Sequence, residues 1–209
     1  MIMKKTKVLS LDHHSEASIL ETAKSVFLKR GYFGTRMQEI ADAAGINKAM
    51  LHYYFRSKDK IFEAIFRESF NCIFPKILEI LNSDEMLKQK IQSFFSRYID
   101  TLLENPHIPG FIMHEIAHNP ERLNSFFQQH LADIPKKFIK QIKDEIDAGN
   151  IIKIDPRQII VNILCLAVFP FAAKPLIQYV LNLKDAEYKN FMNDRKKILP
   201  EFVIRAIKT

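Results

Sequence analysis

Apolar side chains recur three and four residues apart along most of the chain, and no stretch alternates apolar and polar residues as a half-buried strand does. The 209 residues include only 5 glycines, fewer than the turns of a sandwich, a barrel or a glycine-rich nucleotide-binding fold normally need. With 47% hydrophobic and 26% charged residues, the chain has the composition of a globular protein and not of a disordered one. We therefore expect an all-α fold.

Basic residues are concentrated near the N-terminus. Residues 1–60 carry 11 Lys and Arg against 6 Asp and Glu, a net charge of +5, whereas residues 61–209 carry a net charge of only +2. This asymmetry favours a polyanionic partner for the first part of the chain, with DNA as the leading candidate.

Nothing in the sequence predicts export or membrane insertion. The basic N-terminal residues are not followed by the apolar region of a signal peptide. The longest apolar run, 163–173, contains Pro170 and is too short to span a bilayer. Two cysteines exclude a disulfide framework and a cysteine-rich zinc module. We expect a cytoplasmic protein that does not insert into a membrane.

Two short helices joined by a tight turn are predicted between residues 35 and 58. Thr35 is expected to cap the first helix, with Gln38 completing a capping box, and Asn47 is expected to cap the second. Gly45 can adopt the positive φ that the turn requires. This helix-turn-helix predicts a DNA-binding domain.

The two faces of the second short helix differ in chemistry. Four apolar side chains are expected to form a small core with the first helix, and these are Ile40, Ile46, Leu51 and Phe55. The opposite face is expected to point outward. A solvent-facing surface with Lys, His, Tyr and one small residue suits a DNA major groove, and it consists of Lys48, Ala49, His52 and Tyr53.

The division of the chain follows from this motif. Residues 1–58 are expected to form the helix-turn-helix DNA-binding domain. Residues 59–209, whose helices are longer and more apolar, are expected to form a C-terminal helical bundle for ligand binding and dimerisation. Ser83 is expected to cap one of the long helices of this bundle.

Three stretches of the N-terminal segment, taken in order and spacing, resemble the TetR/AcrR family of bacterial transcriptional regulators. They are ILETAKSVFLKRGY (19–32), TRMQEIA (35–41) and AGINKAMLHYYFRSKDK (44–60). The resemblance covers residues 15–66, and the remainder of the chain matches only in size and helical pattern. It implies a ligand-responsive regulator that is not an enzyme, needs no cofactor and binds DNA, most often as a repressor.

The resemblance also implies individual roles. Some positions match residues that contact DNA phosphates, namely Thr35, Tyr53, Tyr54 and Lys58. Others match residues near base edges, namely Asn47, Lys48, Ala49 and His52. Tyrosine is more usual at His52 and glycine at Ala49, so the operator sequence stays open. Structural roles also stay open for Thr35 as a cap, for Tyr54 as a packing residue and for Lys58 as a surface charge.

The C-terminal part carries the implied partners. In the resembling family the last two long helices of two subunits form a four-helix bundle. Residues 159–171 and the final helix are therefore predicted to form a homodimer interface, and the homodimer is predicted to bind a palindromic operator. An unknown small-molecule effector is expected in a cavity between helices. The candidate lining residues are Tyr98, Phe111, Met113, His114, Phe127 and Phe169.

A rival motif lies at residues 114–118. His114, Glu115 and His118 fit the H-E-x-x-H helix of zinc hydrolases, in which two imidazoles on one helix face bind the metal and the glutamate acts as base. The extended zinc motif needs glycine and a third histidine where this chain has Glu121 and Asn124. A metal-dependent hydrolase or a metal-sensing protein remains an alternative, as does a protein-binding helical module without DNA binding.

Overall fold

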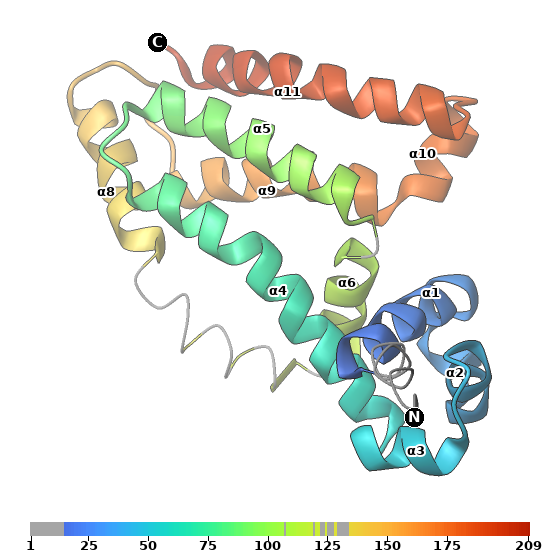
Figure 1. The fold of residues 1–209 in the computed structure, drawn as a ribbon. Helices are drawn as coiled ribbons and strands as arrows, with labels where there is room; N and C mark the ends of the chain where they lie inside the picture. Colours follow the sequence, from blue (N-terminus) through green and yellow to red (C-terminus); the bar gives the residue numbers. More distant parts are fainter. Residues whose placement is uncertain (1–14, 107, 119, 122–123, 125–127, 129–133) are drawn as a thin grey trace, which may run out of the picture. The chain divides into compact units, whose positions relative to one another are not determined.

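A computed structural model describes residues 15–106, 108–118, 120–121, 124, 128 and 134–209 (Figure 1). Within these residues the chain is built of helices, which confirms the predicted all-α class, and its β content is one isolated bridge between Ile151 and Lys208. The chain forms two compact units that divide between Glu68 and Ser69. The expected division was at residue 58, ten residues earlier.

The first unit holds α1 (Glu16–Gly34), α2 (Met37–Ala43), α3 (Lys48–Tyr54) and the first turns of α4 (Lys58–Asn82). Its core includes the four predicted apolar side chains, because Ile40, Ile46, Leu51 and Phe55 are all buried. The other buried apolar side chains of this unit come from α1 and α4, and they are Ile19, Ala23, Phe27, Ile61, Phe62, Ile65 and Phe66.

The packing of α4 explains where the units divide. Phe62 of α4 meets Phe27 of α1 edge to face, with ring centroids 5.4 Å apart. One turn and a half further on, Glu68 pairs with the buried Lys24 of α1 at 2.7 Å. The first turns of α4 therefore belong to the core of the first unit, although the predicted boundary placed them in the second.

Two of the predicted helix caps are wrong. Arg36, not Thr35, is the N-cap of α2, and its backbone N–H donates to the Glu39 carboxylate at 2.9 Å. Met86, not Ser83, is the N-cap of α5, because the Ser83 hydroxyl instead donates to the Ile80 carbonyl at the end of α4. In both places the predicted capping hydroxyl serves the end of the preceding helix.

The second unit continues with α5 (Leu87–Glu104), α6 (Ile108–His118), α8 (Ile134–Asp147), α9 (Pro156–Ala172), α10 (Lys174–Val180) and α11 (Asp185–Ile207). The long helix α11 lies along α5 (Figure 1), and α9 packs against α5, α6, α8 and α10. The core of this unit draws side chains from α4, α5, α9 and α11, among others.

Helix α9 begins with a cap followed by proline. The Asp155 carboxylate accepts the Arg157 backbone N–H at 2.9 Å, and Pro156 occupies the first helical position, where its missing N–H leaves no intrahelical bond unmade. Within the described ranges no single helix has the length and apolarity of a membrane span; α9 and α10 reach them only as a pair, across a bend of 80°.

Candidate functional site

The outward face of α3 has the composition that the sequence predicts. Lys48, Ala49, His52 and Tyr53 are all exposed, and the Tyr53 side chain is 85% exposed. Leu51, on the other side of the same helix, is completely buried. One short helix thus presents a cation, an imidazole, a phenol and a methyl group together, and side chains of this type can contact base edges and phosphates.

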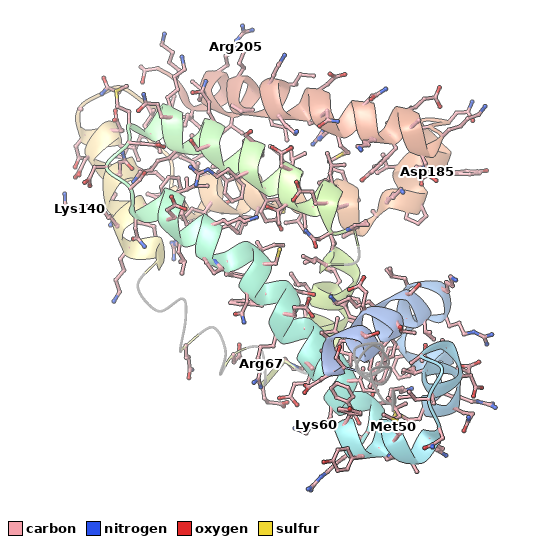
Figure 2. All side chains as sticks on the ribbon, in the orientation of Figure 1. Met50, Lys60, Arg67, Lys140, Asp185 and Arg205 are labelled. Atoms are coloured by element: carbon pink, nitrogen blue, oxygen red, sulfur yellow. The ribbon has the colours of Figure 1, made fainter. Side chains whose placement is uncertain are left out.

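Three local features fix the start of α3. The Asn47 side chain accepts the Met50 backbone N–H at 2.7 Å, as an N-cap does. In the preceding turn Gly45 has a φ of 67°, in the left-handed region that residues with a side chain rarely adopt. Ala41 is completely buried between the helices. Figure 2 shows Met50 on α3 among the side chains of this unit.

Thr35 and Lys58 donate their hydrogen bonds within the protein. The Thr35 hydroxyl, which is buried, donates to the Gly31 carbonyl at 2.7 Å. The Lys58 ammonium donates to the carbonyls of Tyr32 and Thr35 at 2.8 and 3.0 Å, and it lies 4.2 Å from the centre of the Tyr32 ring. These two side chains tie the end of α1, the start of α2 and the start of α4 together.

Tyr54 and His52 each have a neighbour in the protein. The half-buried Tyr54 ring meets the Tyr53 ring edge to face at 5.6 Å. When His52 carries its proton on Nδ1, it donates to the Arg56 carbonyl at 3.2 Å. Both contacts hold the aromatic side chains of α3 at defined angles to the helix.

The second unit has a partly open cavity of about 490 Å³ between α4, α5, α6, α8 and α9. Its volume lies within the range of about 300–1,000 Å³ that is typical of small-molecule sites. Of the candidate lining residues, Tyr98, Met113 and Phe169 do line it, whereas Phe111 and His114 are not among its lining residues. Phe127 lies outside the described residues.

Lys90 also lines the cavity, and it was not predicted. It is 2% exposed and is the one charged side chain among the described lining residues. Lys90 lies three residues after Leu87 and four before Phe94, on the apolar stripe of α5. Its register on that stripe predicts burial, but only the packing of α4 and α9 shows that it lines a cavity.

Within the described part of the chain, the rival metal motif finds no third ligand. The rings of His114 and His118 stack with centroids 4.2 Å apart, and the His114 carbonyl lies 2.9 Å from Nδ1 of His118. Among the described residues, no group of three His, Cys, Asp or Glu side chains is placed to hold a metal ion. The side chain of Glu115 lies outside the described part of the chain.

The segment 159–171, which is predicted to form part of a dimer interface, has a buried face and an exposed face. Ile159, Ile163 and Phe171 are buried in the core of their own unit. On the other face of the segment Val161 is exposed, and on α11 two apolar side chains one turn apart, Ile198 and Phe202, are exposed as well. Each of these three is more than half exposed.

Comparisons with known proteins bear on both units. Residues 19–65 match the family described as bacterial regulatory proteins, tetR family. The chain is 26% identical over 136 residues, 63% of its length, to the transcriptional repressor NicS of Pseudomonas putida. It is also 26% identical over 116 residues, 56% of its length, to IcaR of Staphylococcus epidermidis, a negative regulator of the biofilm operon icaADBC.

These matches span less than two thirds of the relatives, namely 61% of NicS and 60% of IcaR. The fold is similar over 97% of both chains to KstR2, a ketosteroid transcriptional regulator of Mycobacterium tuberculosis, with a TM-score of 0.72 at 17% identity. At that identity the likeness concerns the fold alone.

Proposed function

We propose that the chain is a member of the tetR family of bacterial regulatory proteins, because residues 19–65 match that family, and that it is a DNA-binding transcriptional regulator that acts as a repressor. The observation that carries the proposal is the exposed face of α3, where Lys48, His52 and Tyr53 project from a helix whose opposite side is fixed by the buried Leu51. NicS is a repressor and IcaR a negative regulator, which supports the sign of regulation.

The side chains of α3 divide into two roles. Asn47, Lys48 and Ala49 lie at the N-terminal end of α3, the end by which recognition helices contact base edges, and His52 lies one turn after Lys48. All four would meet base edges. The Ala49 methyl would suit contact with a thymine methyl group. Tyr53, further along and far into solvent, would donate to a phosphate, and Tyr54 would do the same beside it.

Thr35 and Lys58 take a different part in the proposal. Their donors already serve carbonyl groups at the junction of α1, α2 and α4. They would therefore act on DNA binding by holding α2 and α3 in place, and their direct contribution to phosphate contacts would be small.

A homodimer is the form in which such a helix would read DNA. Two-fold symmetry places two recognition helices in successive major grooves, about 34–36 Å apart on a palindromic operator. The exposed apolar side chains Val161, Ile198 and Phe202 on α9 and α11 support an interface there, because a partner subunit would remove them from water.

The cavity in the second unit supports ligand control. A small molecule that fills it would weaken repression only if it binds the DNA-incompetent geometry of the dimer better than the DNA-bound one. The coupling is reciprocal, so operator DNA would weaken ligand binding by the same factor.

The test is DNA binding measured by fluorescence anisotropy on fragments from upstream of the protein's own gene and on random DNA. Lys48→Ala should lose about 1–3 kcal/mol on the operator and much less on random DNA, as a base-reading residue does. Tyr53→Phe should weaken both alike. Lys29→Ala, which removes an exposed lysine from α1, is the matched control for charge.

Two results contradict the proposal at different levels. Equal losses on operator and random DNA for Lys48→Ala would refute its role in reading bases. Absence of any salt-dependent binding by the wild-type protein at low ionic strength would refute DNA binding itself, since phosphate contacts make affinity fall steeply with salt.

A further inference from the structure

Among the residues that the structure describes, two lysines are buried, and their surroundings differ. Lys24 in the first unit is 6% exposed, and its ammonium pairs with the carboxylates of Glu68 and Glu21 at 2.7 and 3.1 Å. Burial alone would lower the pKa of Lys24, but these two hydrogen-bonded carboxylates outweigh it and raise the pKa. In Lys24 the protein neutralises a buried ammonium with its own carboxylates.

Lys90 lacks such a partner. Its ammonium donates to the Leu81 carbonyl at 3.1 Å, and within the described part of the chain no carboxylate lies within ion-pair distance of it. Burial lowers the pKa of Lys90 and the nearby Lys137 lowers it further, while Asp84 and Glu85 oppose this from beyond contact distance. A buried ammonium has three donors, and the Leu81 carbonyl accepts one hydrogen bond from them.

Lys90 lies at one end of the long apolar lining of this cavity. The lining residues of α5 recur on one helix face from Lys90 through Phe94 and Tyr98 to Leu102. At 1.5 Å per residue that face extends for about 18 Å. The other described lining residues, from α4, α6, α8 and α9, are uncharged and almost all apolar.

The exposed lining residues lie on α6 and on the C-terminal half of α9. Met113, Ile116 and Phe169 are all exposed, whereas Lys90 is buried. Since α6 follows the C-terminal end of α5 and Lys90 lies near its N-terminal end, a ligand entering between Met113 and Phe169 would pass along α5 before it reached the ammonium.

We infer that this cavity takes an acidic amphiphile: a single unbranched apolar chain that ends in a carboxylate, with the carboxylate paired to the Lys90 ammonium and the chain lying along α5. A carboxylate would supply the counter-charge that the protein itself provides for Lys24. The mostly apolar walls would bind the chain, and among the described lining residues they offer no second charged group to a doubly charged molecule. The inference that such a ligand regulates DNA binding rests on the proposed function. The inference that the cavity binds the ligand does not.

The experiment is isothermal titration calorimetry of the full chain without DNA. The chain contains no tryptophan whose fluorescence could report binding. The probes are dodecanoate, dodecanol and dodecylamine below their micelle-forming concentrations. Dodecanoate should bind about tenfold to a hundredfold more tightly than dodecanol, the contribution of a charge-assisted hydrogen bond. Dodecylamine should bind more weakly than dodecanol, because its ammonium would face that of Lys90.

Lys90→Met keeps the length of the side chain and removes its charge. It should bind dodecanol about as well as the wild type does and should show no preference for dodecanoate. Lys88→Met, two residues away on the same helix and exposed, is the control and should keep the preference. The three-probe comparison on wild-type protein is an independent test should Lys90→Met not fold.

Three outcomes overturn the inference: equal binding of dodecanoate and dodecanol by the wild type, an intact preference in Lys90→Met, or no binding of any probe. DNA binding measured separately distinguishes the two proposals. If operator binding is normal but no amphiphile binds, the ligand class is wrong; if dodecanoate binds but DNA does not, the regulatory function is wrong.

Discussion

Lys58→Met is the substitution that best separates a structural lysine from a phosphate-binding one. The Lys58 ammonium donates to the carbonyls of Tyr32 and Thr35 and lies over the Tyr32 ring. Removing a donor and leaving its acceptors unpaired costs about 1–3 kcal/mol, and losing a cation–π contact at a partly exposed site costs about 0.5–1 kcal/mol more. Water can reach the half-buried site, so we expect a loss of about 2 kcal/mol.

The loss should be local, and hydrogen exchange followed by mass spectrometry measures it. Amides in the peptide 37–46, which covers α2 and the turn, should lose protection by roughly 30-fold, the factor that about 2 kcal/mol represents. The control is Lys60→Met. Lys60 pairs with Glu63 one helical turn away at the surface, and this contact contributes at most about 0.5 kcal/mol. Figure 2 labels Lys60 on α4.

DNA binding by the same two variants completes the test. Lys58→Met should weaken binding on every sequence because α3 is less firmly held, while the slope of log affinity against log salt stays that of the wild type. A phosphate-contacting ammonium would instead reduce the slope by about 0.9 on its removal. If Lys58→Met kept wild-type protection in peptide 37–46 and showed that smaller slope, the structural role of Lys58 would be refuted.

Three further outcomes are expected. Gly45→Ala should destabilise the first unit by about 1 kcal/mol in urea denaturation, because the φ of Gly45 is 67° although its surroundings are open. Gly110→Ala inside α6 should instead stabilise the second unit by about 0.5–1 kcal/mol, because the added methyl group meets no atom there. Phe202→Asp should convert a dimer to a monomer in sedimentation velocity, with Gln92→Asp, an exposed position on α5, leaving it dimeric. Purified protein should hold well under one zinc per chain by metal analysis, and His118→Ala should not change that content.

The sequence predicted the features that depend on neighbouring residues. The Asn47 cap, the positive φ of Gly45 and the burial of Leu51 beside an exposed His52 all follow from spacing within a few residues, and the structure confirms them.

What the sequence did not predict depends on contacts between distant residues. Thr35 has the chemistry of a cap, but its hydroxyl is buried against the Gly31 carbonyl, so the cap passes to Arg36. The ammonium of Lys58 is directed inward by carbonyls 23 and 26 residues away. Lys90 looks like an ordinary charged residue until α4 and α9 are packed around it.

The seven-residue helix α3 keeps its stabilising and its exposed positions on separate sides. Leu51 fixes it to the first unit, while Lys48, Ala49, His52 and Tyr53 leave the core untouched. If α3 reads bases as proposed, a combinatorial library at those four codons would vary DNA preference while leaving the buried contacts of the helix unchanged. For anyone wishing to retarget such a protein to a new promoter, that makes α3 an unusually forgiving place to begin.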